Sequence, residues 1–242
     1  MKNDFIKFDL MFDHKRLIED LETCKQYEWV LHFNKNDYTG TWKTISLRSV
    51  SGHETDNFPT PNEAFQDTPL LANCPYFNEV IQFFQCPKEA VRLLALSPQS
   101  YIKEHTDHRA GYENRNFRIH VPLQSNEKVE FVVNNQQLPM KIGECWYANF
   151  NLPHSVRNDG ENERIHLVID CLSNEWSDKF FADAGYDFNE KTVLVGPTFS
   201  DNYTYDRSVK LQMIEQLSQM DTDAARNIIS QLKTELAIED HE

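Results

Sequence analysis

The chain has 242 residues, a formal net charge of −14 and 40% hydrophobic residues. That length is enough for one full hydrophobic core. The acidic balance, without clustered basic residues, argues against a nucleic-acid backbone as partner. The five cysteines are odd in number and lack a paired metal-binding spacing, so we expect reduced thiols in a cytoplasmic protein.

The sequence has no apolar run close to the roughly 18 residues that a membrane helix needs. Its opening, MKNDFIKFD, lacks the uninterrupted apolar region of a signal peptide. We therefore expect a soluble protein that is neither exported nor held in a membrane. The net charge does not exclude a small anionic ligand, because Arg48, Arg118 and Arg164 can supply local positive charge.

Two helices are expected in the first part of the chain. Asp13 can act as an N-cap, and apolar residues follow it at helical spacing: Leu17, Ile18, Leu21 and Cys24. A second helical pattern covers residues 76–85 and ends before Pro87.

Residues 29–33 and 41–47 alternate between polar and apolar side chains, which predicts strands. Trp42 falls within the second strand and Arg48 follows its end. From the pattern alone, Trp42 is either a core or rim aromatic or part of a binding site. Residues 51–69 are polar and lack periodicity, so we expect a long loop that is either mobile or a lid.

From Val91 onward, short apolar runs alternate with turn signals, which predicts an all-β sandwich or jelly roll. The expected strands are residues 91–96, 101–104, 117–123, 129–133, 144–148, 155–157 and 164–170. After Asp170 the chain becomes polar and irregular. We expect one domain over residues 1–190.

Two amphipathic helices are expected in a C-terminal appendage over residues 191–242. Their apolar positions are Val209, Met213 and Leu217 in the first helix and Ala225, Ile228, Ile229, Leu232 and Leu236 in the second. The pair either packs on the domain or forms a homodimer contact.

His105 and Asp107 stand two positions apart, and on an extended strand such side chains point to the same side. His154 would be a third ligand on a later strand. Two histidines and one carboxylate form a facial set on iron(II) that leaves positions open for a co-substrate and dioxygen. The His-x-Asp pair alone is a weak signal, so its context matters.

A turn signal at Asp159-Gly160 separates His154 from Arg164. It predicts a hairpin that brings the two side chains near each other across paired strands. Arg164 could then bind a carboxylate as a fork of donors, which lysine cannot do.

Two expected strand faces carry charged and imidazole side chains: Arg118, His120 and Pro122 on one, and Arg164, His166, Val168 and Asp170 on the other. Their opposite faces are apolar. Because an unpaired charge in a plain core is unfavourable, these faces predict a polar pocket. For His166 and Asp170 we expect a structural role.

Residues 92–170 resemble the aspartyl/asparaginyl/proline hydroxylase family of iron(II)- and 2-oxoglutarate-dependent dioxygenases. The matching pieces are His105-x-Asp107, Arg118-x-His120-x-Pro122-Leu123, Gly143-Glu144-x-Trp146, Leu152-Pro153-His154 and Arg164-x-His166-Leu167-Val168-x-Asp170, with weaker matches at Gly40-x-Trp42 and Leu47-Arg48. Members that act on aspartyl residues of secreted proteins commonly lack the metal-binding carboxylate. Asp107 makes the chain more similar to the bacterial free-proline hydroxylases.

The resemblance implies a cupin-like double-stranded β-helix (jelly roll) with iron(II) on His105, Asp107 and His154. It also implies that Arg164 binds the far carboxylate of 2-oxoglutarate, in a pocket completed by Arg118, His120 and Trp42. The expected reaction is dioxygen-dependent hydroxylation of a free amino acid, proline-like, or of an aspartyl or asparaginyl residue in a peptide.

2-Oxoglutarate brings two carboxylates to the site and an amino-acid substrate brings a third, for which Arg48 is the candidate partner. Two alternatives remain open at this point. One is a cupin-like protein that binds a small anion without turnover, and the weaker one is a zinc hydrolase on the same three ligands.

Overall fold

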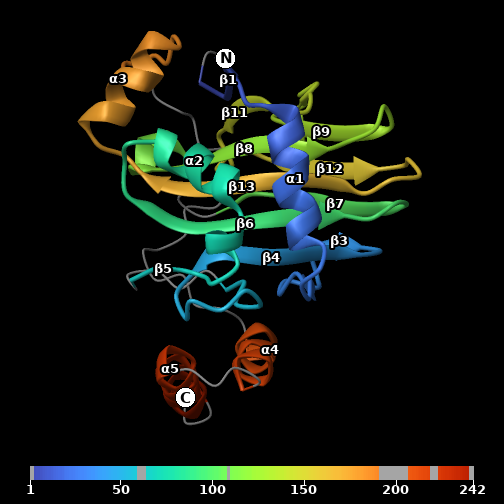
Figure 1. Ribbon diagram of the computed structural model, residues 1–242. Coiled ribbons are helices and arrows are strands. Elements are labelled where there is room, and N and C mark those ends of the chain that lie inside the picture. Colours follow the sequence, from blue (N-terminus) through green and yellow to red (C-terminus); the bar gives the residue numbers. More distant parts are fainter. Residues whose placement is uncertain (1–2, 59–63, 108–109, 191–206, 219–222, 240–242) are drawn as a thin grey trace.

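Two antiparallel β-sheets pack face to face in the computed structural model (Figure 1), which describes residues 3–58, 64–107, 110–190, 207–218 and 223–239. The eight-stranded sheet has the order β1-β11-β8-β13-β6-β4-β2, with β5 paired to β4, and the five-stranded sheet has the order β10-β9-β12-β7-β3. This arrangement confirms the mainly β, jelly-roll class.

The strands are β1 (Phe5–Met11), β2 (Val30–Leu31), β3 (Tyr38–Thr39), β4 (Trp42–Ser49), β5 (Gln66–Asp67), β6 (Lys88–Leu96), β7 (Ser100–His105), β8 (Asn116–Gln124), β9 (Val129–Val133), β10 (Gln136–Gln137), β11 (Glu144–Ala148), β12 (His154–Asn158) and β13 (Arg164–Leu172). The helices are α1 (His14–Cys24), α2 (Pro75–Phe83), α3 (Glu175–Asp183), α4 (Arg207–Leu217) and α5 (Asp223–Glu239), with short 3-10 turns at Leu71–Asn73 and Tyr112–Asn114.

Helices α1, α2 and α3 cover the outer face of the eight-stranded sheet (Figure 1). Leu17 of α1, Phe77 of α2 and Phe181 of α3 share one apolar core with the outward side chains of the sheet. The N-cap prediction for α1 is confirmed, because the Asp13 side chain accepts a hydrogen bond from the Arg16 backbone N–H at 3.1 Å. Asn174 caps α3 in the same way through the Ser177 backbone N–H.

A second apolar core fills the space between the two sheets. Leu94 and Val168 contribute from the eight-stranded sheet, and Ile102, Phe131 and Val156 contribute from the five-stranded sheet. Because side chains alternate along a strand, β13 sends Ile165, Leu167 and Ile169 to the outer core and its polar side chains inward. The predicted polar strand faces therefore lie inside the sandwich.

The expected hairpin at Asp159-Gly160 is wrong. β12 pairs with β7 and β9 in the five-stranded sheet, whereas β13 pairs with β6 and β8 in the eight-stranded sheet. The chain reverses at the predicted turn, but it crosses from one sheet to the other. His154 and Arg164 consequently lie on facing sheets and not on neighbouring strands.

Four further expectations differ from the structure or lie beyond it. The stretch after Asp170 continues as β13 and then forms α3, so it is not irregular. The predicted loop over residues 51–69 contains β5, which pairs with β4, and residues 59–63 lie outside the described part. Its role as a lid, and the domain boundary near residue 190, stay predictions.

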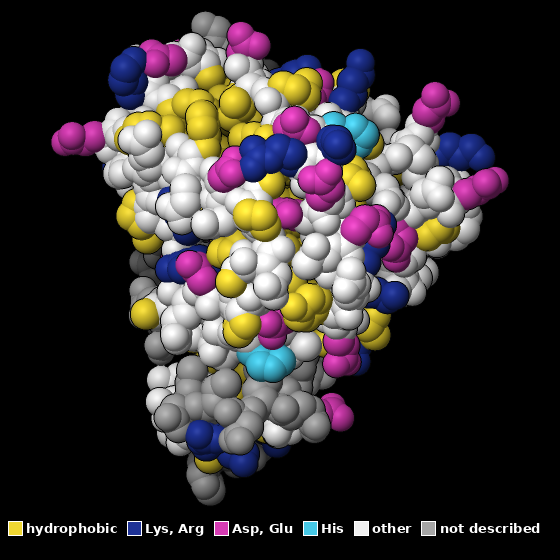
Figure 2. All heavy atoms as spheres, in the orientation of Figure 1, with side chains coloured by type: hydrophobic (Ala, Val, Ile, Leu, Met, Phe, Trp, Pro, Cys, Tyr) yellow, Lys and Arg dark blue, Asp and Glu magenta, His cyan; other side chains and the backbone are white. Residues whose placement is uncertain are grey.

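Helices α4 and α5 form the expected C-terminal pair, placed beyond β4 and β5 (Figure 1). Val50 and Phe58 share a third apolar core with Met213 of α4 and Ile228 of α5. Nowhere in the described ranges is there a helix long and apolar enough to cross a membrane. On the face shown in Figure 2, acidic and basic side chains are interspersed, with hydrophobic side chains gathered towards the end where α2 and α3 lie.

Candidate active site

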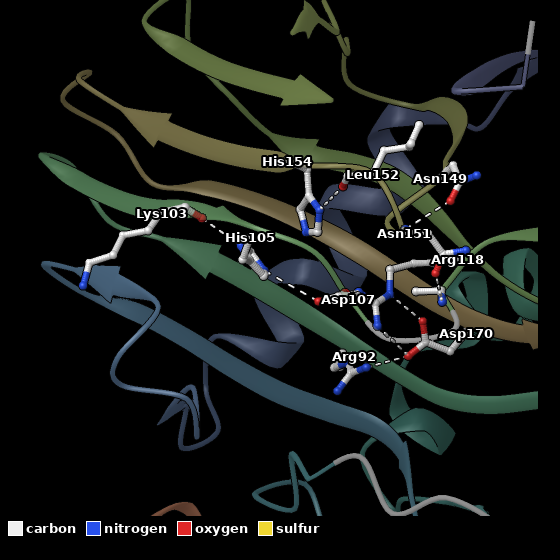
Figure 3. A network of polar contacts seen from close by, with 11 residues as sticks. Arg92, Lys103, His105, Asp107, Arg118, Asn149, Asn151, Leu152, His154 and Asp170 are labelled. Carbon is white, nitrogen blue, oxygen red and sulfur yellow. Dashed lines mark hydrogen bonds and ion pairs between the residues drawn. The ribbon is translucent and has the colours of Figure 1, made fainter. Parts of the chain in front are cut away.

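His105, Asp107 and His154 converge at one end of the space between the sheets (Figure 3). One potential ligand atom from each lies within 4.8 Å of the other two. His105 ends β7 and His154 begins β12, where the two residues are direct cross-strand neighbours. Asp107 lies past the end of β7, and its backbone N–H donates to the Phe150 carbonyl at 2.8 Å. The structure therefore brings the three predicted metal ligands together.

Both histidines are oriented through the ring nitrogen that faces away from the cluster. His105 Nδ1 lies 2.7 Å from the Lys103 carbonyl oxygen and His154 Nδ1 lies 3.0 Å from the Leu152 carbonyl oxygen. A carbonyl can only accept, so Nδ1 carries the proton and Nε2 is left with a free lone pair. His105 Nε2 is 3.6 Å from Asp107 Oδ1.

The electrostatic environment favours the protonation states that a metal requires. Burial lowers the pKa of His154 to about 4, with a further lowering by the charges of His105 and Arg118 and an opposite effect of Asp107. Burial alone would raise the pKa of Asp107, but the charges of Arg118, His154 and His105 hold it well below its usual range. At neutral pH the cluster therefore offers a neutral imidazole and a carboxylate, as metal binding demands.

Two arginines and two carboxylates form a network beside the cluster (Figure 3). Arg118 donates from Nη1 to Asp107 Oδ2 at 2.7 Å and from Nε to Asp170 Oδ1 at 2.6 Å. Arg92 donates from Nη2 to Asp170 Oδ2 at 2.5 Å. Arg118 thereby fixes the orientation of Asp107, while Asp170 holds both guanidinium groups. Arg92 Nε is buried and has no hydrogen-bond partner among the described residues.

A second polar chain lies on the inner face of β13 and β8. Arg164 is only 2% exposed, its Nη2 lies 2.7 Å from His166 Nδ1, and its guanidinium carbon is 5.2 Å from the centre of the Phe131 ring. His166 Nδ1 is in turn 3.2 Å from His120 Nδ1. In the part of the chain that the structure describes, the buried atoms Arg164 Nε and His120 Nε2 have no hydrogen-bond partner.

Arg164 is a buried cation without a counter-ion. Between residues that the structure describes, no carboxylate lies within ion-pair distance of its guanidinium. Burial lowers the pKa of Arg164 to about 9, and it lowers the pKa values of His120 and His166 well below the usual range. One unpaired guanidinium beside neutral imidazoles is the arrangement expected for a site that binds a carboxylate.

The other predicted site residues lie elsewhere. Trp42 stacks on the imidazole of His32, with ring centres 3.6 Å apart, and it is separated from Arg164 by Leu96 of the intervening strand. Arg48 donates to Asp67 Oδ1 at 2.5 Å and to the Lys88 carbonyl at 3.4 Å, which ties it to β5 and β6. Within the described residues, the ion pairs of Arg118 join it to Asp107 of the metal cluster and to Asp170, and not to the polar chain of Arg164.

Sequence reasoning assigned no role to two buried residues near the cluster, Arg92 and His32. Arg92 could have been found, because a charged residue there shares one face of β6 with the apolar Leu94 and Leu96. His32 carries no such signal. It lies just past the two-residue strand β2, and its position depends on stacking against Trp42 from another strand.

Residues 9–174 match the family model described as Aspartyl/Asparaginyl beta-hydroxylase. The chain belongs to this family. A curated relative, L-proline cis-4-hydroxylase from Rhizobium meliloti (strain 1021), is 30% identical over 173 residues, which make up 70% of this chain and 61% of the relative. The chain thus matches less than two thirds of that protein's length.

Among solved structures, an oxidoreductase of the 2OG-Fe(II) oxygenase family from Burkholderia pseudomallei resembles this hydroxylase-family chain with a TM-score of 0.50. The sequence identity is 16%, and the match covers 68% of this chain and 84% of that one. At 16% sequence identity, this similarity shows a shared fold and nothing about the reaction.

Proposed function

We propose that the chain is an iron(II)- and 2-oxoglutarate-dependent dioxygenase that hydroxylates a free, proline-like amino acid. The observation that carries this proposal is the pairing of a two-histidine, one-carboxylate cluster with an unpaired, buried Arg164 on the facing sheet. The proline hydroxylase among its relatives and the family membership support the reaction type.

The donor set fits iron(II). His105 and His154 offer Nε2 lone pairs and Asp107 offers a charged oxygen, and such a set would leave positions on a bound iron(II) for further ligands. When bound, iron with 2-oxoglutarate and dioxygen supplies the oxidising power for C–H hydroxylation, with succinate and carbon dioxide as co-products. Zinc hydrolysis is less well supported, because a dicarboxylate pocket beside the cluster has no evident use in it.

Arg164 is the proposed partner for the far carboxylate of 2-oxoglutarate, because its unpartnered, buried Nε is a donor that a carboxylate would satisfy. His120 is proposed to line the same pocket: Arg164 donates to His166 Nδ1, so His120 Nδ1 carries the proton in its contact with His166 and Nε2 of the neutral ring is an acceptor. His166 lies between them and holds their relative orientation. Arg118 is proposed to position Asp107, because its contacts go to Asp107 and Asp170.

Two arginines are candidates for the substrate carboxylate. Arg48 was the candidate from sequence, and its guanidinium is paired with Asp67 at the sheet edge. Arg92 is better supported by the structure, because it is buried, keeps a free Nε donor and joins the network that reaches Asp107 through Asp170 and Arg118. A cytoplasmic location and a homodimer stay predictions.

Succinate formation tests the proposal. The purified chain is supplied with iron(II), ascorbate and 2-oxoglutarate, with and without L-proline and a panel of other free amino acids. We expect succinate and hydroxylated product in equal amounts with at least one of them. Folded, metal-loaded protein that binds 2-oxoglutarate but forms no succinate with any amino acid or peptide would favour the non-catalytic, anion-binding alternative.

A further inference from the structure

Buried polar atoms that lack a partner fall into separate groups within the described residues. Eight side-chain atoms qualify: His32 Nδ1, Trp42 Nε1, Thr44 Oγ1, Asn57 Oδ1, Arg92 Nε, His120 Nε2, Arg164 Nε and Gln212 Oε1. His120 and Arg164 belong to the proposed 2-oxoglutarate pocket, and Gln212 lies in α4. The other five form what we call the flank group: His32, Trp42, Thr44, Asn57 and Arg92.

Backbone contacts bring the flank group together along β4. His32 donates its backbone N–H to the Trp42 carbonyl at 2.8 Å, and its ring stacks on Trp42 at an interplanar angle of 11°. Thr44 is the next residue on the inner face of β4, and Arg92 of β6 pairs with the one after it, Ser46. Asn57 reaches the same place from the following loop, because its Nδ2 donates to the Leu31 carbonyl at 3.0 Å.

This group lies on β4, β6 and the segments next to them, and Leu96 of β6 separates its Trp42 from Arg164 of β13. Trp42 packs in the inter-sheet core with Ile102 of β7, the strand that ends at His105. Burial lowers the pKa of His32 far below its usual range, and the charges of Arg92, Arg118 and His105 lower it further against the opposing effect of Asp107. His32 is therefore a neutral imidazole within the field of the metal cluster and its arginine network.

The segment that contains Asn57 packs against the C-terminal helices α4 and α5. Phe58, the next residue, packs in the third apolar core with Met213 of α4 and Ile228 of α5, and its ring centre lies 5.7 Å from that of Phe33. Asn57 is 2% exposed and His32 is 9% exposed. Both side chains are thus held in place and do not face bulk water.

The hydrogen-bonding types of these atoms restrict the ligand. Trp42 Nε1 and Arg92 Nε can only donate, Asn57 Oδ1 can only accept, and His32 Nδ1 and Thr44 Oγ1 can do either. A second dicarboxylate would leave Asn57 Oδ1 without a partner, because an ionised dicarboxylate has no N–H or O–H to donate. A free amino acid offers a carboxylate and a protonated amine, whereas a residue within a peptide chain has lost both charges.

Resting on the proposed function, we propose that His32, Thr44 and Asn57 recognise the amine of the substrate, so that the site takes a free amino acid whose nitrogen is unblocked. The carboxylate of the same ligand then faces Arg92 and Trp42. The C-terminal helix pair acquires a role in this arrangement, since it supports the loop that carries Asn57.

Two binding probes test the amine requirement independently of turnover. Free L-amino acids including L-proline, and their N-acetyl forms, are added to the chain loaded with Mn(II) and 2-oxoglutarate, and thermal unfolding is followed. We expect a rise in Tm with at least one free amino acid and none with its N-acetyl form. An N-acetyl form or a peptide that stabilises the protein as well as the free amino acid would overturn the proposal.

Thr44→Val and His32→Phe test the residues, because each removes an unpartnered polar atom with little change in shape. In the ligand-free protein we expect an equal or higher Tm, since a buried polar atom without a partner opposes folding. The concentration of the amino acid needed for half-maximal stabilisation should rise about tenfold or more, as expected for loss of a hydrogen bond to a charged group. The 2-oxoglutarate dependence of Tm should stay unchanged.

Tyr38→Phe is the matched control. It removes a hydroxyl from the same aromatic stack, but one that already bonds to the His32 carbonyl at 3.4 Å. Unchanged amino-acid binding in both test variants would show that the flank atoms serve structure only. Failure of the proposed function has a different signature, because it would remove succinate formation from the wild-type chain without changing the difference between free and N-acetylated ligands.

Discussion

Arg118 donates to the carboxylate of Asp107 at 2.7 Å, so the acidic metal-ligand candidate is paired with a cation in the protein itself. The same guanidinium donates to Asp170, which also holds Arg92. The network leaves Asp107 Oδ1 on the side of His105, 3.6 Å from its Nε2. One oxygen of Asp107 is thus fixed by Arg118 while the other faces the site of the ion.

Arg118→Met is therefore expected to weaken metal binding. Outer-shell partners of metal ligands typically contribute about 10- to 100-fold to metal affinity, and Asp107 would lose its partner in this variant. Titration with Co(II) or Mn(II) measures the effect, with 2-oxoglutarate affinity determined separately at saturating metal. If metal affinity is retained and only 2-oxoglutarate affinity falls, Arg118 belongs to the cofactor pocket, as the family resemblance implied.

His154→Ala should abolish metal retention and turnover while leaving the fold intact. The β12 ladder does not depend on the imidazole, and the apolar core between the sheets remains. Metal content after gel filtration and a circular dichroism spectrum check the two parts of this expectation. His14→Ala, at an exposed position at the start of α1, is the control. A His154→Ala variant that binds metal as tightly as wild type would remove this residue from the cluster.

Arg164→Met should uncouple stability from 2-oxoglutarate binding. Without ligand, the variant is expected to be at least as stable as wild type, because a buried guanidinium without a counter-ion opposes folding. With 2-oxoglutarate at about 100 times its Kd, wild type should gain roughly 2.7 kcal/mol, and the variant should gain far less.

The loss of a buried contact to a charged group is worth about 2 to 5 kcal/mol, so the 2-oxoglutarate requirement of Arg164→Met should rise by tens-fold or more. Urea unfolding with and without 2-oxoglutarate measures both effects. Arg157→Met, a half-exposed arginine on β12 that pairs with Asp159, is the control. An unchanged ligand-induced stabilisation in Arg164→Met would place the anion pocket elsewhere.

Asp170→Asn should destabilise the fold in a pH-dependent way. Burial by itself would raise the pKa of Asp170, but the charges of Arg118 and Arg92 outweigh burial and hold the pKa below its usual range. The ionised carboxylate therefore stabilises the folded state above about pH 4, the ordinary pKa of Asp. This contribution is lost as the pH falls through the depressed folded-state pKa.

At pH 7 the variant should lose about 3 to 5 kcal/mol, because the buried Arg92 and the partly buried Arg118 lose their shared partner. The difference from wild type in unfolding free energy should shrink below pH 4, and urea unfolding over this range measures it. Asp183→Asn, at an exposed pair with Lys179, should show little effect. A difference that stays constant with pH would mean that the charge of Asp170 is not what stabilises the network.

The two-residue periodicity of strands predicts which side chains share a face, and it predicts only part of this site. The two-residue period places Arg164 and His166 on one inward face, and the structure joins them at 2.7 Å. The same period suggested that His105 and Asp107 share a strand, yet β7 ends at His105 and a bond to Phe150 positions Asp107. The cluster was predictable, but the backbone that forms it was not.

Local sequence patterns do not predict which distant strands pair with each other. A turn signal at Asp159-Gly160 specifies a reversal, but it does not say whether the flanking strands pair with each other. In the structure the buried amide of Asn158 donates to the Leu96 and Asn162 carbonyls and so ties the corner to the other sheet. Likewise, nothing near Arg48 in the sequence indicated that Asp67 would pair with it.

Arg92 and Arg48 can be separated by measuring succinate and hydroxylated product together. If Arg92 binds the substrate carboxylate, Arg92→Met should raise the KM for the amino acid by tens-fold, in line with about 2 to 5 kcal/mol for a buried contact to a charge. Succinate formed without product should persist, because 2-oxoglutarate would still reach the metal beside Arg164. Arg48→Met should leave KM close to wild type, since its guanidinium is already paired with Asp67 and its side chain is one quarter exposed. The opposite result, a raised KM in Arg48→Met with normal coupling in Arg92→Met, would restore Arg48 as the substrate residue and leave Arg92 only the task of holding Asp170.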